Sequence, residues 1–599
     1  MKKLLLLILI SLFSFKLFSQ VIPAERRVDW HDIINKFEFK PIFNKININD
    51  FGGDNTGLND NSSAFQSALK TLNGKSGVIF FPKGKYLFTK PIVLSDSILL
   101  AGEGNNVSQL IFNLGKQPVN AIVISGTDEN VFASVKGGFE KGSYKILTDS
   151  AFYFSAGDWV EIRENNGSWD FRPAPWAKNV VGQIEKVTGV SGDTVFLENP
   201  LRISYKIDLK PVIHKIFPIK NTAVQCLKIQ RLDNPQTGGG YNIYFNLAIN
   251  SQVSGIESDT SNGSHIYISR SSKIQIKGNT FSYAFSYDGK GTNGYGVTLA
   301  HHSGACLITN NVFYHLRHAM MVKTGANGNV FSYNYSFDPV RTEFPYDASG
   351  DISLHGHYPF ANLFEGNVVQ NIVIDHYWGP AGPENTFFRN RAELYGIIMT
   401  TSDSTSTNEQ NFVGNETTDP AFFHGQFTLT GKDNFSYGND ILGNIIPSGT
   451  NNLTDSSYYL QNKPVFWLDT INWPSVGIPN PLGYGTNPAY AAYKTGKYYN
   501  YCTGGIYTAV SKIRNDVDFI VYPNPATNFI HINKGKPYHG NIRIQFISLL
   551  GKPVYSIKNI QSNGNLITIT LPENISSGIY FLKIFDDGKY YVKKLRIVK

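Results

Sequence analysis

The middle of the chain repeats one short pattern four times: Phe331-Ser332-Tyr333-Asn334, Phe364-Glu365-Gly366-Asn367, Phe387-Phe388-Arg389-Asn390 and Phe412-Val413-Gly414-Asn415. In each copy an aromatic residue precedes an asparagine by three positions. Isoleucine takes the aromatic position in two earlier copies that end at Asn279 and Asn311, and a looser copy ends at Asn439. The successive asparagines are 32, 23, 33, 23, 25 and 24 residues apart. A spacing of about 23 to 25 residues is that of one coil built from three short strands.

The repeat therefore predicts a parallel β-helix. Asparagine tolerates the left-handed backbone of a tight turn, and stacked asparagines form ladders of side-chain hydrogen bonds. The four phenylalanines would stack inside the coil in the same way. A sandwich or a propeller whose asparagines are spaced by chance is the alternative.

The beginning of the body supports this prediction by resemblance. Asp50-Phe51-Gly52-Gly53-Asp54 and residues 59–66 and 77–86 are similar to the N-terminal capping region of the pectate-lyase-like β-helix superfamily. The resemblance implies a right-handed parallel β-helix, a fold that carries polysaccharide lyases, glycoside hydrolases and phage tailspikes. A serine cap and an apolar stripe over residues 61–69 predict a short helix that closes the open end of the coil.

Composition narrows the class of protein. The chain has 599 residues, among them 41 Phe, 33 Tyr and 7 Trp, so it can build a large core and is not a disordered chain. Its net charge of +8 comes without a run of Lys or Arg, which argues against a nucleic-acid partner and fits an acidic polymer. Cys226, Cys306 and Cys502 allow one disulfide at most, and whether any pair forms stays open.

The N-terminus predicts export. Lys2-Lys3, an apolar run over residues 4–15 and a small residue before Gln20 are typical of a cleaved signal peptide, here at residues 1–19. The run is shorter than the roughly 20 residues that a transmembrane helix needs. We expect no membrane span.

The C-terminus also predicts export. Residues 516–599 alternate short apolar strands with turns, which indicates a small β-sandwich. Tyr522-Pro523-Asn524-Pro525, Ser577-Gly578-Ile579-Tyr580 and residues 593–599 resemble a type A sorting domain of the type IX secretion system. The resemblance implies a Bacteroidetes-like protein that the type IX machinery secretes or attaches to the cell surface. A glycan-binding or adhesive module is the alternative.

The rest of the chain divides into an N-terminal segment at 20–40, the β-helix at 41–450, and a C-terminal cap and linker at 451–515. Residues 150–205 break the periodicity and predict a β-rich insertion that packs on the helix. Its Trp169 and Trp176 either pack against the helix or stack on sugars.

Strand alternation aligns one outward column of side chains across the coils. The inward positions fall on Leu299, Val322, Leu354, Ile374 and Met399. The next residue of each strand faces out, which gives the column Ala300, Lys323, His355, Asp375 and Thr400. Neighbouring coils lie about 4.8 Å apart, so Lys323, His355 and Asp375 should touch or nearly touch. A solvated polar ladder without function is the alternative.

Further candidates surround this column. Those expected to bind substrate are His301, His357, His376, Tyr377 and Trp378. The two long asparagine spacings predict insertions at about 284–296 and 338–351 that project beside the column, and the second contains Arg341. In pectate-lyase-like enzymes the asparagine ladder lies between the second and third sheets and the substrate cleft on the first. The resemblance implies the same place for the column.

Lys323, His355, Asp375 and Arg341 are the catalytic candidates of a lyase that cleaves an anionic, uronic-acid polysaccharide by β-elimination. Such an enzyme neutralises the carboxylate beside the abstracted C5 proton, stabilises an enolate-like intermediate and supplies a base. Lys323 or Arg341 would neutralise the substrate carboxylate, and His355 or Lys323 would be the base that takes the C5 proton. Asp375 would orient His355 or, with other carboxylates, bind Ca²⁺. No cofactor is certain.

Two other functions stay open. A glycoside hydrolase needs two carboxylates across the glycosidic bond, and Asp375 with Glu384, Asp347 or Asp351 could supply them. A surface adhesin would bind glycan without turnover.

The motifs of the familiar enzymes are incomplete. The paired aspartates of polygalacturonases are missing, and Ile374-Asp375-His376 is similar to one element of pectate lyases whose Arg-x-Pro-x-x-Arg partner is absent. No family's catalytic set is therefore transferred. A zinc site built from His355, His357 and His301 is a further alternative, since alternate residues of a strand face the same way.

Overall fold

The structure is a computed structural model that describes residues 20–235, 239–400, 406–503, 505–508, 519–534, 542–548, 553–560, 565–586 and 589–599. The signal peptide predicted at residues 1–19 lies outside this part of the chain. The chain forms two compact units, Met1–Ala509 and Val510–Lys599. None of the helices that the structure describes has the length and apolarity needed to traverse a bilayer.

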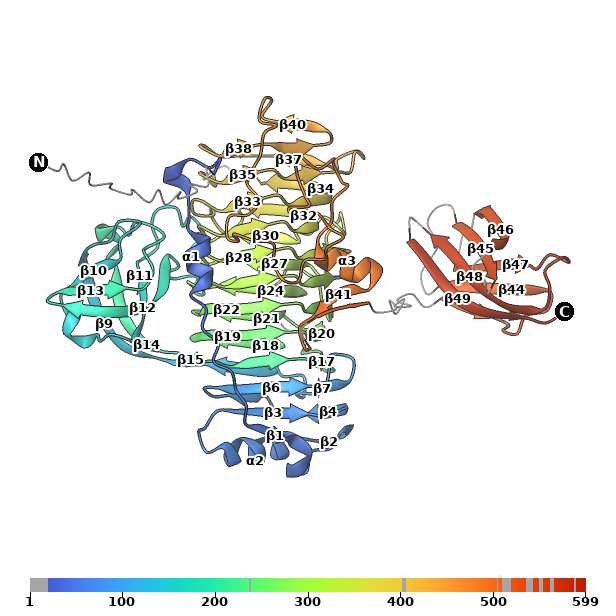
Figure 1. Cartoon of the computed structure of the whole chain (residues 1–599), viewed down its shortest axis with the longest axis horizontal. Helices are drawn as coiled ribbons and strands as arrows, with labels where there is room; N and C mark the ends of the chain where they lie inside the picture. The colour runs from blue at the N-terminus through green and yellow to red at the C-terminus, as the bar shows by residue number, and fades with distance from the viewer. Residues whose placement is uncertain are drawn as a thin grey trace, which may run out of the picture. The chain divides into compact units, whose positions relative to one another are not determined.

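The first unit is a right-handed parallel β-helix, in which each full coil contributes one strand to each of three long sheets (Figure 1). Sheet 1 contains β5 (Ile92–Leu94), β8 (Ile122–Ser125), β18 (Ile243–Asn246), β21 (Ser264–Ser269), β24 (Tyr295–Ala300), β27 (His318–Val322), β30 (Ile352–His355), β37 (Gln426–Thr428) and the ends of β32 (Val368–Asp375) and β34 (Arg391–Met399).

Sheet 2 contains β1 (Lys45–Asn47), β3 (Gly77–Phe81), β6 (Ile98–Gly102), β16 (Ala223–Gln225), β19 (Ala248–Ser254), β22 (Ser272–Lys277), β25 (Leu307–Thr309), β28 (Val330–Ser332), β31 (Leu363–Glu365), β33 (Thr386–Phe388), β35 (Asn411–Val413) and β38 (Phe435–Tyr437). Sheet 3 contains β2 (Thr56–Asp60), β4 (Gly84–Phe88), β7 (Ser108–Phe112), β17 (Lys228–Arg231), β20 (Glu257–Ser261), β23 (Thr280–Ala284), β26 (Val312–Tyr314), β29 (Tyr335–Phe337), the starts of β32 and β34, β36 (Glu416–Thr417) and β39 (Asn439–Ile441).

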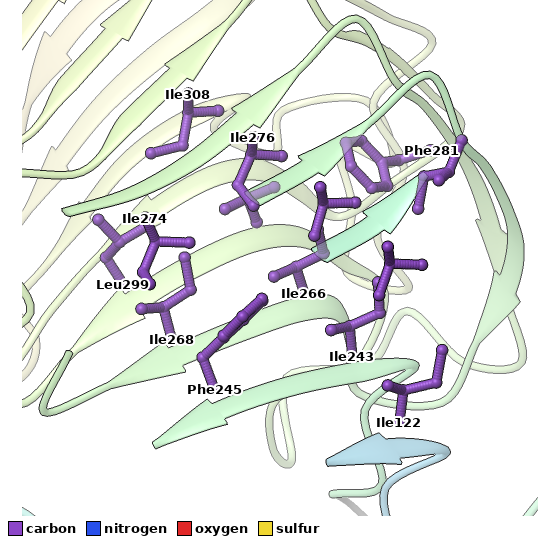
Figure 2. Packing of buried hydrophobic residues seen from close by; sticks show 14 of the residues in the cluster. Ile122, Ile243, Phe245, Ile266, Ile268, Ile274, Ile276, Phe281, Leu299 and Ile308 are labelled. Carbon is purple, nitrogen blue, oxygen red and sulfur yellow. The ribbon is translucent and has the colours of Figure 1, made fainter. Parts of the chain in front are cut away.

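Apolar side chains fill the inside of the coils in register. On sheet 1, Ile122, Ile243 and Ile266 occupy one inward position on three neighbouring strands, and all three are fully buried (Figure 2). On sheet 2, Phe331 stacks on Phe364 with ring centroids 5.1 Å apart, and the stack continues through Phe387 and Phe412. Each fully buried side chain of this size contributes about 1.5–3 kcal/mol by leaving water. The predicted phenylalanine stack is confirmed.

The asparagine ladder also forms as predicted, between sheets 2 and 3. The amide of Asn367 donates to Oδ1 of Asn390 at 2.8 Å and accepts from Asn334 at 2.9 Å, and the same bond links the other ladder asparagines from Asn279 to Asn439. A second, shorter ladder at the turn between sheets 1 and 2 was not predicted. It consists of Asn329, Asn362, Asn385 and Gln410.

A helix closes the N-terminal end of the coil, as the sequence indicated. Helix α2 (Ser62–Leu72) buries Ala64, Phe65, Ala68 and Leu72 against the first coils, because these residues fall on one helical face. Its N-cap residue is Asn61 rather than the predicted serine.

The insertion is a closed antiparallel barrel of six strands. They are β9 (Thr127–Gly137), β10 (Lys145–Thr148), β11 (Trp159–Arg163), β12 (Gly182–Ser191), β13 (Thr194–Leu197) and β14 (Val212–Phe217). The barrel therefore begins before residue 150 and ends after residue 205, the limits drawn from the sequence. Closure satisfies every strand edge within the barrel, which lets it stand on the coil without extending a sheet.

Segments from both ends of the first unit cover the outer faces of sheets 2 and 3. Helix α1 (Trp30–Asn35) lies on sheet 2, where the Trp30 indole donates to the Ala361 carbonyl at 2.8 Å. Residues 453–467 pack on the same sheet and helix α3 (Pro488–Thr495) on sheet 3. A disulfide joins Cys226 to Cys502, between β41 (Lys497–Asn500) and β42 (Gly505–Thr508), and Cys306 is free and buried.

The second unit is a β-sandwich. One sheet contains β43 (Phe519–Tyr522), β44 (Phe529–Lys534) and β47 (Leu566–Thr570). The other contains β45 (Ile542–Ser548), β46 (Pro553–Ile560), β48 (Gly578–Asp586) and β49 (Lys589–Ile597). Ile530, Ile544 and Leu582 are among the fully buried residues between them.

Candidate active site

The predicted column lies on the outer face of sheet 1. Register pairs Val322 with Leu354 and His355 with Asp375, so Lys323, His355 and Asp375 follow one another on three neighbouring strands. The five residues predicted to face inward on these strands and on the two that flank them are no more than 1% exposed. The alternation inferred from the sequence is therefore confirmed, and the three polar side chains stand on the face that the terminal segments do not cover at these positions.

His355 and Asp375 form a hydrogen-bonded pair. Nδ1 of His355 lies 2.5 Å from Oδ2 of Asp375, and the other carboxylate oxygen accepts from the backbone N–H of Tyr377 at 3.1 Å. The two side chains keep 22% and 17% of their surface exposed. The ring of His318 lies 6.1 Å from the His355 ring. Asp375 thus fixes the ring, and the second ring nitrogen of His355 is left to act as acid or base.

Lys323 is buried and forms no ion pair with any residue that the structure describes. It is 9% exposed, and burial lowers its pKa from 10.5 to about 8, with no neighbouring charge acting in the opposite direction. Its Nζ lies 5.4 Å from the centre of the Trp176 ring and 5.6 Å from that of Tyr267. Aromatic faces attract the ammonium but neutralise none of its charge.

One side of the column is bordered by the connection between β11 and β12 of the barrel, which we call the rim loop (residues 164–181). Its Trp176 contacts His357 and Trp378, with ring centroids 4.8 and 5.3 Å apart. The backbone of the loop comes so close to Gly325 that a Cβ there would lie 1.6 Å from the Val180 carbonyl oxygen. Only glycine permits this approach.

The rim presents an aromatic surface to solvent. Trp176 is 43% exposed and Tyr377 is 58% exposed. The guanidinium of Arg172, also from the rim loop, lies 4.2 Å from the centre of the Tyr377 ring. The sequence left open whether Trp176 packs or binds sugar. Its contacts with His357 and Trp378 confirm the packing role, and sugar binding stays a prediction.

All three histidines predicted to bind substrate are buried or half-buried. His357 is fully buried among Trp176, Trp378 and Asp170, and burial lowers its pKa to about 4. His376 is 1% exposed and accepts from the Thr407 backbone N–H. We therefore revise their assignment: these two support the rim from beneath. His301 is half-buried near Lys323, and burial lowers its pKa to about 3, so it stays neutral.

The insertions at 284–296 and 338–351 lie together on the other side of the column. Glu343 accepts from the backbone N–H of Gly289, which joins the two insertions. Arg341 donates to the Pro345 carbonyl of its own loop. Burial lowers the pKa of His318 and the charge of Arg341 lowers it further, so Arg341 acts electrostatically on a residue beside the column. Arg317, which sequence analysis did not single out, donates to the Tyr295 hydroxyl at 3.2 Å.

The carboxylates considered for a hydrolase are engaged elsewhere. Asp351 is 2% exposed and bonds Ser336 and the backbone of Asn371. Asp347 accepts from the Tyr395 hydroxyl, and Glu384 pairs with Lys141 of the barrel. Within the described ranges, no group of three or more His, Cys, Asp or Glu side chains could hold a metal ion.

Two family models match the chain. Residues 45–204 match the model described as "Rhamnogalacturonase A/epimerase, pectate lyase-like", and residues 520–599 match the "Secretion system C-terminal sorting domain". No curated protein matches the sequence.

Solved structures show remote likeness. An exopolygalacturonase from Thermotoga maritima is 12% identical with a TM-score of 0.39, over 68% of this chain and 90% of that one. The A-module of the mannuronan C-5 epimerase AlgE4 from Azotobacter vinelandii is 12% identical with a TM-score of 0.36, over 65% and 95%. PfbA, a surface adhesin of Streptococcus pneumoniae, is 10% identical with a TM-score of 0.31, over 68% and 96%.

The sorting domain places the protein outside the cell, and the matched residues agree with the resemblance seen in the sequence. The chain joins a pectate-lyase-like β-helix to a type IX secretion sorting domain, and it is a protein that is secreted or attached to the cell surface.

Proposed function

We propose that this protein is an extracellular lyase that cleaves a uronic-acid polysaccharide by β-elimination on the outer face of sheet 1. The observation that carries the proposal is the hydrogen-bonded pair of His355, on the strand next to Lys323, and Asp375, one strand further, beside an ammonium that pairs with no carboxylate of the described residues. A base and an uncompensated cation within one rung of each other are the two groups that proton abstraction beside a carboxylate needs.

Each residue has one part in the reaction. The Lys323 ammonium pairs with the uronate carboxylate and stabilises the negative charge that spreads onto it. Nε2 of His355 takes the C5 proton, while Asp375 holds the ring through Nδ1. The electron pair of the C5–H bond forms the C4–C5 double bond, and the C4–O glycosidic bond breaks. His355 can return its proton to the leaving oxygen.

The charges near the column favour an anionic substrate. Arg172 on the rim and Arg317 and Arg341 on the opposite border add three guanidinium groups, which lie near Tyr377, Tyr295 and His318 on the two sides of the column. These positive charges would attract a polyuronate toward the column before it binds there.

Hydrolysis is the second candidate, since the matched family model is named for a rhamnogalacturonase as well as an epimerase. It would require a second carboxylate near Asp375, and the three candidates are bonded elsewhere. A glycan-binding adhesin would need neither the pair nor the free ammonium.

The test is an incubation of the full chain with alginate, pectate, glycosaminoglycans and neutral glycans. Ultraviolet absorbance of the unsaturated uronate and reducing ends are followed together. Lys323→Ala and His355→Ala should abolish both signals. His424→Ala is the matched control, because His424 makes a similar hydrogen bond to Asp419, at 2.7 Å, and neither residue belongs to the column.

Each result leads to a different conclusion. Reducing ends without absorbance would transfer the assignment to hydrolysis. A change in uronate stereochemistry without cleavage would indicate epimerisation by the same proton abstraction. Glycan binding without any turnover would favour the adhesin.

A further inference from the structure

Three tyrosines form a platform on the outer face of sheet 1, several coils before the column. Tyr244 and Tyr267 are register partners on β18 and β21, and Tyr241 lies just before β18. The rings of Tyr241 and Tyr267 stack with centroids 4.4 Å apart and an angle of 11°, and the Tyr244 ring lies 5.9 Å from Tyr241 and 6.1 Å from Tyr267. Tyr241 and Tyr244 are half-buried and so retain exposed ring surface.

Neighbouring residues hold this platform in place. The Tyr241 hydroxyl is hydrogen-bonded to Thr292 of the insertion at 284–296. Gly263 leaves room for the Tyr241 ring, because a Cβ at that position would lie 2.8 Å from it. The rings are therefore preorganised, and binding a ligand would cost little side-chain entropy.

The platform is continuous with the column. The Tyr267 ring that stacks on Tyr241 is the same ring that lies 5.6 Å from the Lys323 ammonium. Its outward position on β21 is followed by Thr298, Met321 and Ser353 on the next strands, directly beside the column. Tyr267 and these three residues are at most 8% exposed, so they form a buried layer that joins the exposed parts of Tyr241 and Tyr244 to Lys323.

We propose that Tyr241 and Tyr244, supported by the buried Tyr267 ring, form a distal sugar-binding subsite that takes the apolar C–H face of a pyranose ring of the same polysaccharide chain. The inference rests on the proposed function for the identity of the polymer. A pyranose offers one face of C–H groups, which an aromatic ring covers favourably, while its hydroxyls point to water and to polar neighbours.

The distance sets the length of the ligand. Tyr244 lies on β18 and His355 on β30, with β21, β24 and β27 between them. Four steps of about 4.8 Å separate the two residues by about 19 Å along the helix axis. A sugar at the column cannot reach the platform unless several more units follow it. The enzyme should therefore prefer long chains to short ones.

The experiment measures binding separately from turnover. Full-length protein carrying His355→Ala is titrated with trimers and hexamers of alginate and of polygalacturonate by calorimetry. Adding Tyr244→Ala should raise the Kd of the hexamer about three- to tenfold and leave that of the trimer unchanged. Tyr244→Phe keeps the ring and should restore hexamer binding. Tyr484→Ala, at a tyrosine 82% exposed in the C-terminal segment, is the matched control.

The outcomes separate the two proposals. Length-dependent binding that Tyr244→Ala abolishes supports the platform even if the wild-type protein turns nothing over, in which case the proposed function fails. Turnover by the wild type with identical hexamer Kd values in both tyrosine variants and the control overturns the platform and leaves the function standing. Absence of binding to all four oligosaccharides also overturns the platform.

Discussion

His355 and Asp375 lie side by side on β30 and β32, and their Nδ1 and Oδ2 atoms are 2.5 Å apart. A carboxylate accepts but does not donate, so this contact assigns the ring proton to Nδ1 and leaves Nε2 with a free lone pair. The backbone N–H of Tyr377 bonds the other carboxylate oxygen and fixes the orientation of Asp375. In the proposed reaction, this Nε2 lone pair takes a proton from a substrate on the outer face of sheet 1.

Removing the base should abolish most of the activity. His355→Ala is expected to lower kcat by about 10²- to 10⁴-fold, and Asp375→Asn should also lower kcat, because the amide can turn its N–H₂ toward Nδ1 and favour the wrong tautomer. Initial rates on the polysaccharide found in the panel measure both effects. Equal rates in His355→Ala and His424→Ala would contradict the assignment.

Burial of the charged Lys323 side chain should lower the free energy of unfolding of the protein. Replacing it with Met removes a charge whose pKa falls from 10.5 to about 8 on folding, which corresponds to about 3 kcal/mol. The folded-state pKa is the lower one, so the stabilisation by Lys323→Met is complete below pH 8 and disappears as pH rises toward 10.5. Urea unfolding at pH 7 and pH 10 measures the difference. A variant that is inactive and no more stable at pH 7 would argue against an unpaired ammonium.

The same pKa predicts the alkaline limit of activity. If the ammonium pairs with the substrate carboxylate, kcat/KM should fall as pH rises through about 8, because Lys323 loses its proton. Lys323→Arg stays charged and should move this limit upward by more than one pH unit. Rates that increase through pH 8 in the wild type would instead identify neutral Lys323 as the base.

Trp176, on the rim loop of the barrel, should affect both substrate binding and the pKa of Lys323. Trp176→Ala removes an aromatic contact for substrate and admits water to Lys323, so KM should rise about three- to tenfold and the alkaline limit should move toward higher pH. A full pH profile of kcat/KM records both changes. Phe152→Ala, at a barrel residue 77% exposed, serves as the control and should alter neither.

One rung of the asparagine ladder should contribute several kcal/mol to the free energy of unfolding. The side chain of Asn367 takes part in four hydrogen bonds, two with Asn334, one with Asn390 and one with the Phe331 carbonyl. Asn367→Leu leaves these buried partners unpaired and should lower the free energy of unfolding by about 3–5 kcal/mol. Chemical denaturation measures the loss. The exposed Asn444, the first residue of β40 (Asn444–Ile446), which pairs antiparallel with β39, is the comparison, and Asn444→Leu should change stability by less than about 0.5 kcal/mol.

Much of the site follows from one periodic signal. Once the asparagines set the length of a coil, alternation within each strand determined which residues face out, and register placed Lys323, His355 and Asp375 in a line. These inferences succeed because a β-helix repeats the same geometry at each rung, so a residue's neighbours lie one period away in sequence. The second asparagine ladder, at Asn329 and its partners, had the same period and could have been found in the same way.

The coil, the ladder, the capping helix and the outward column were predictable from the sequence because each depends on local pattern or fixed spacing, and the sorting domain was predictable from its resemblance. The start of the barrel at Thr127, the contact of its rim loop through Trp176 with Lys323, and the burial of His357 behind that loop became known from the three-dimensional structure alone. It also decided that Cys226 pairs with Cys502. These contacts join segments that are far apart in the chain, namely the irregular insertion and the C-terminal segment of the first unit with the coils that they cover. Such segments have no period, so their docking depends on shape and burial that no spacing records.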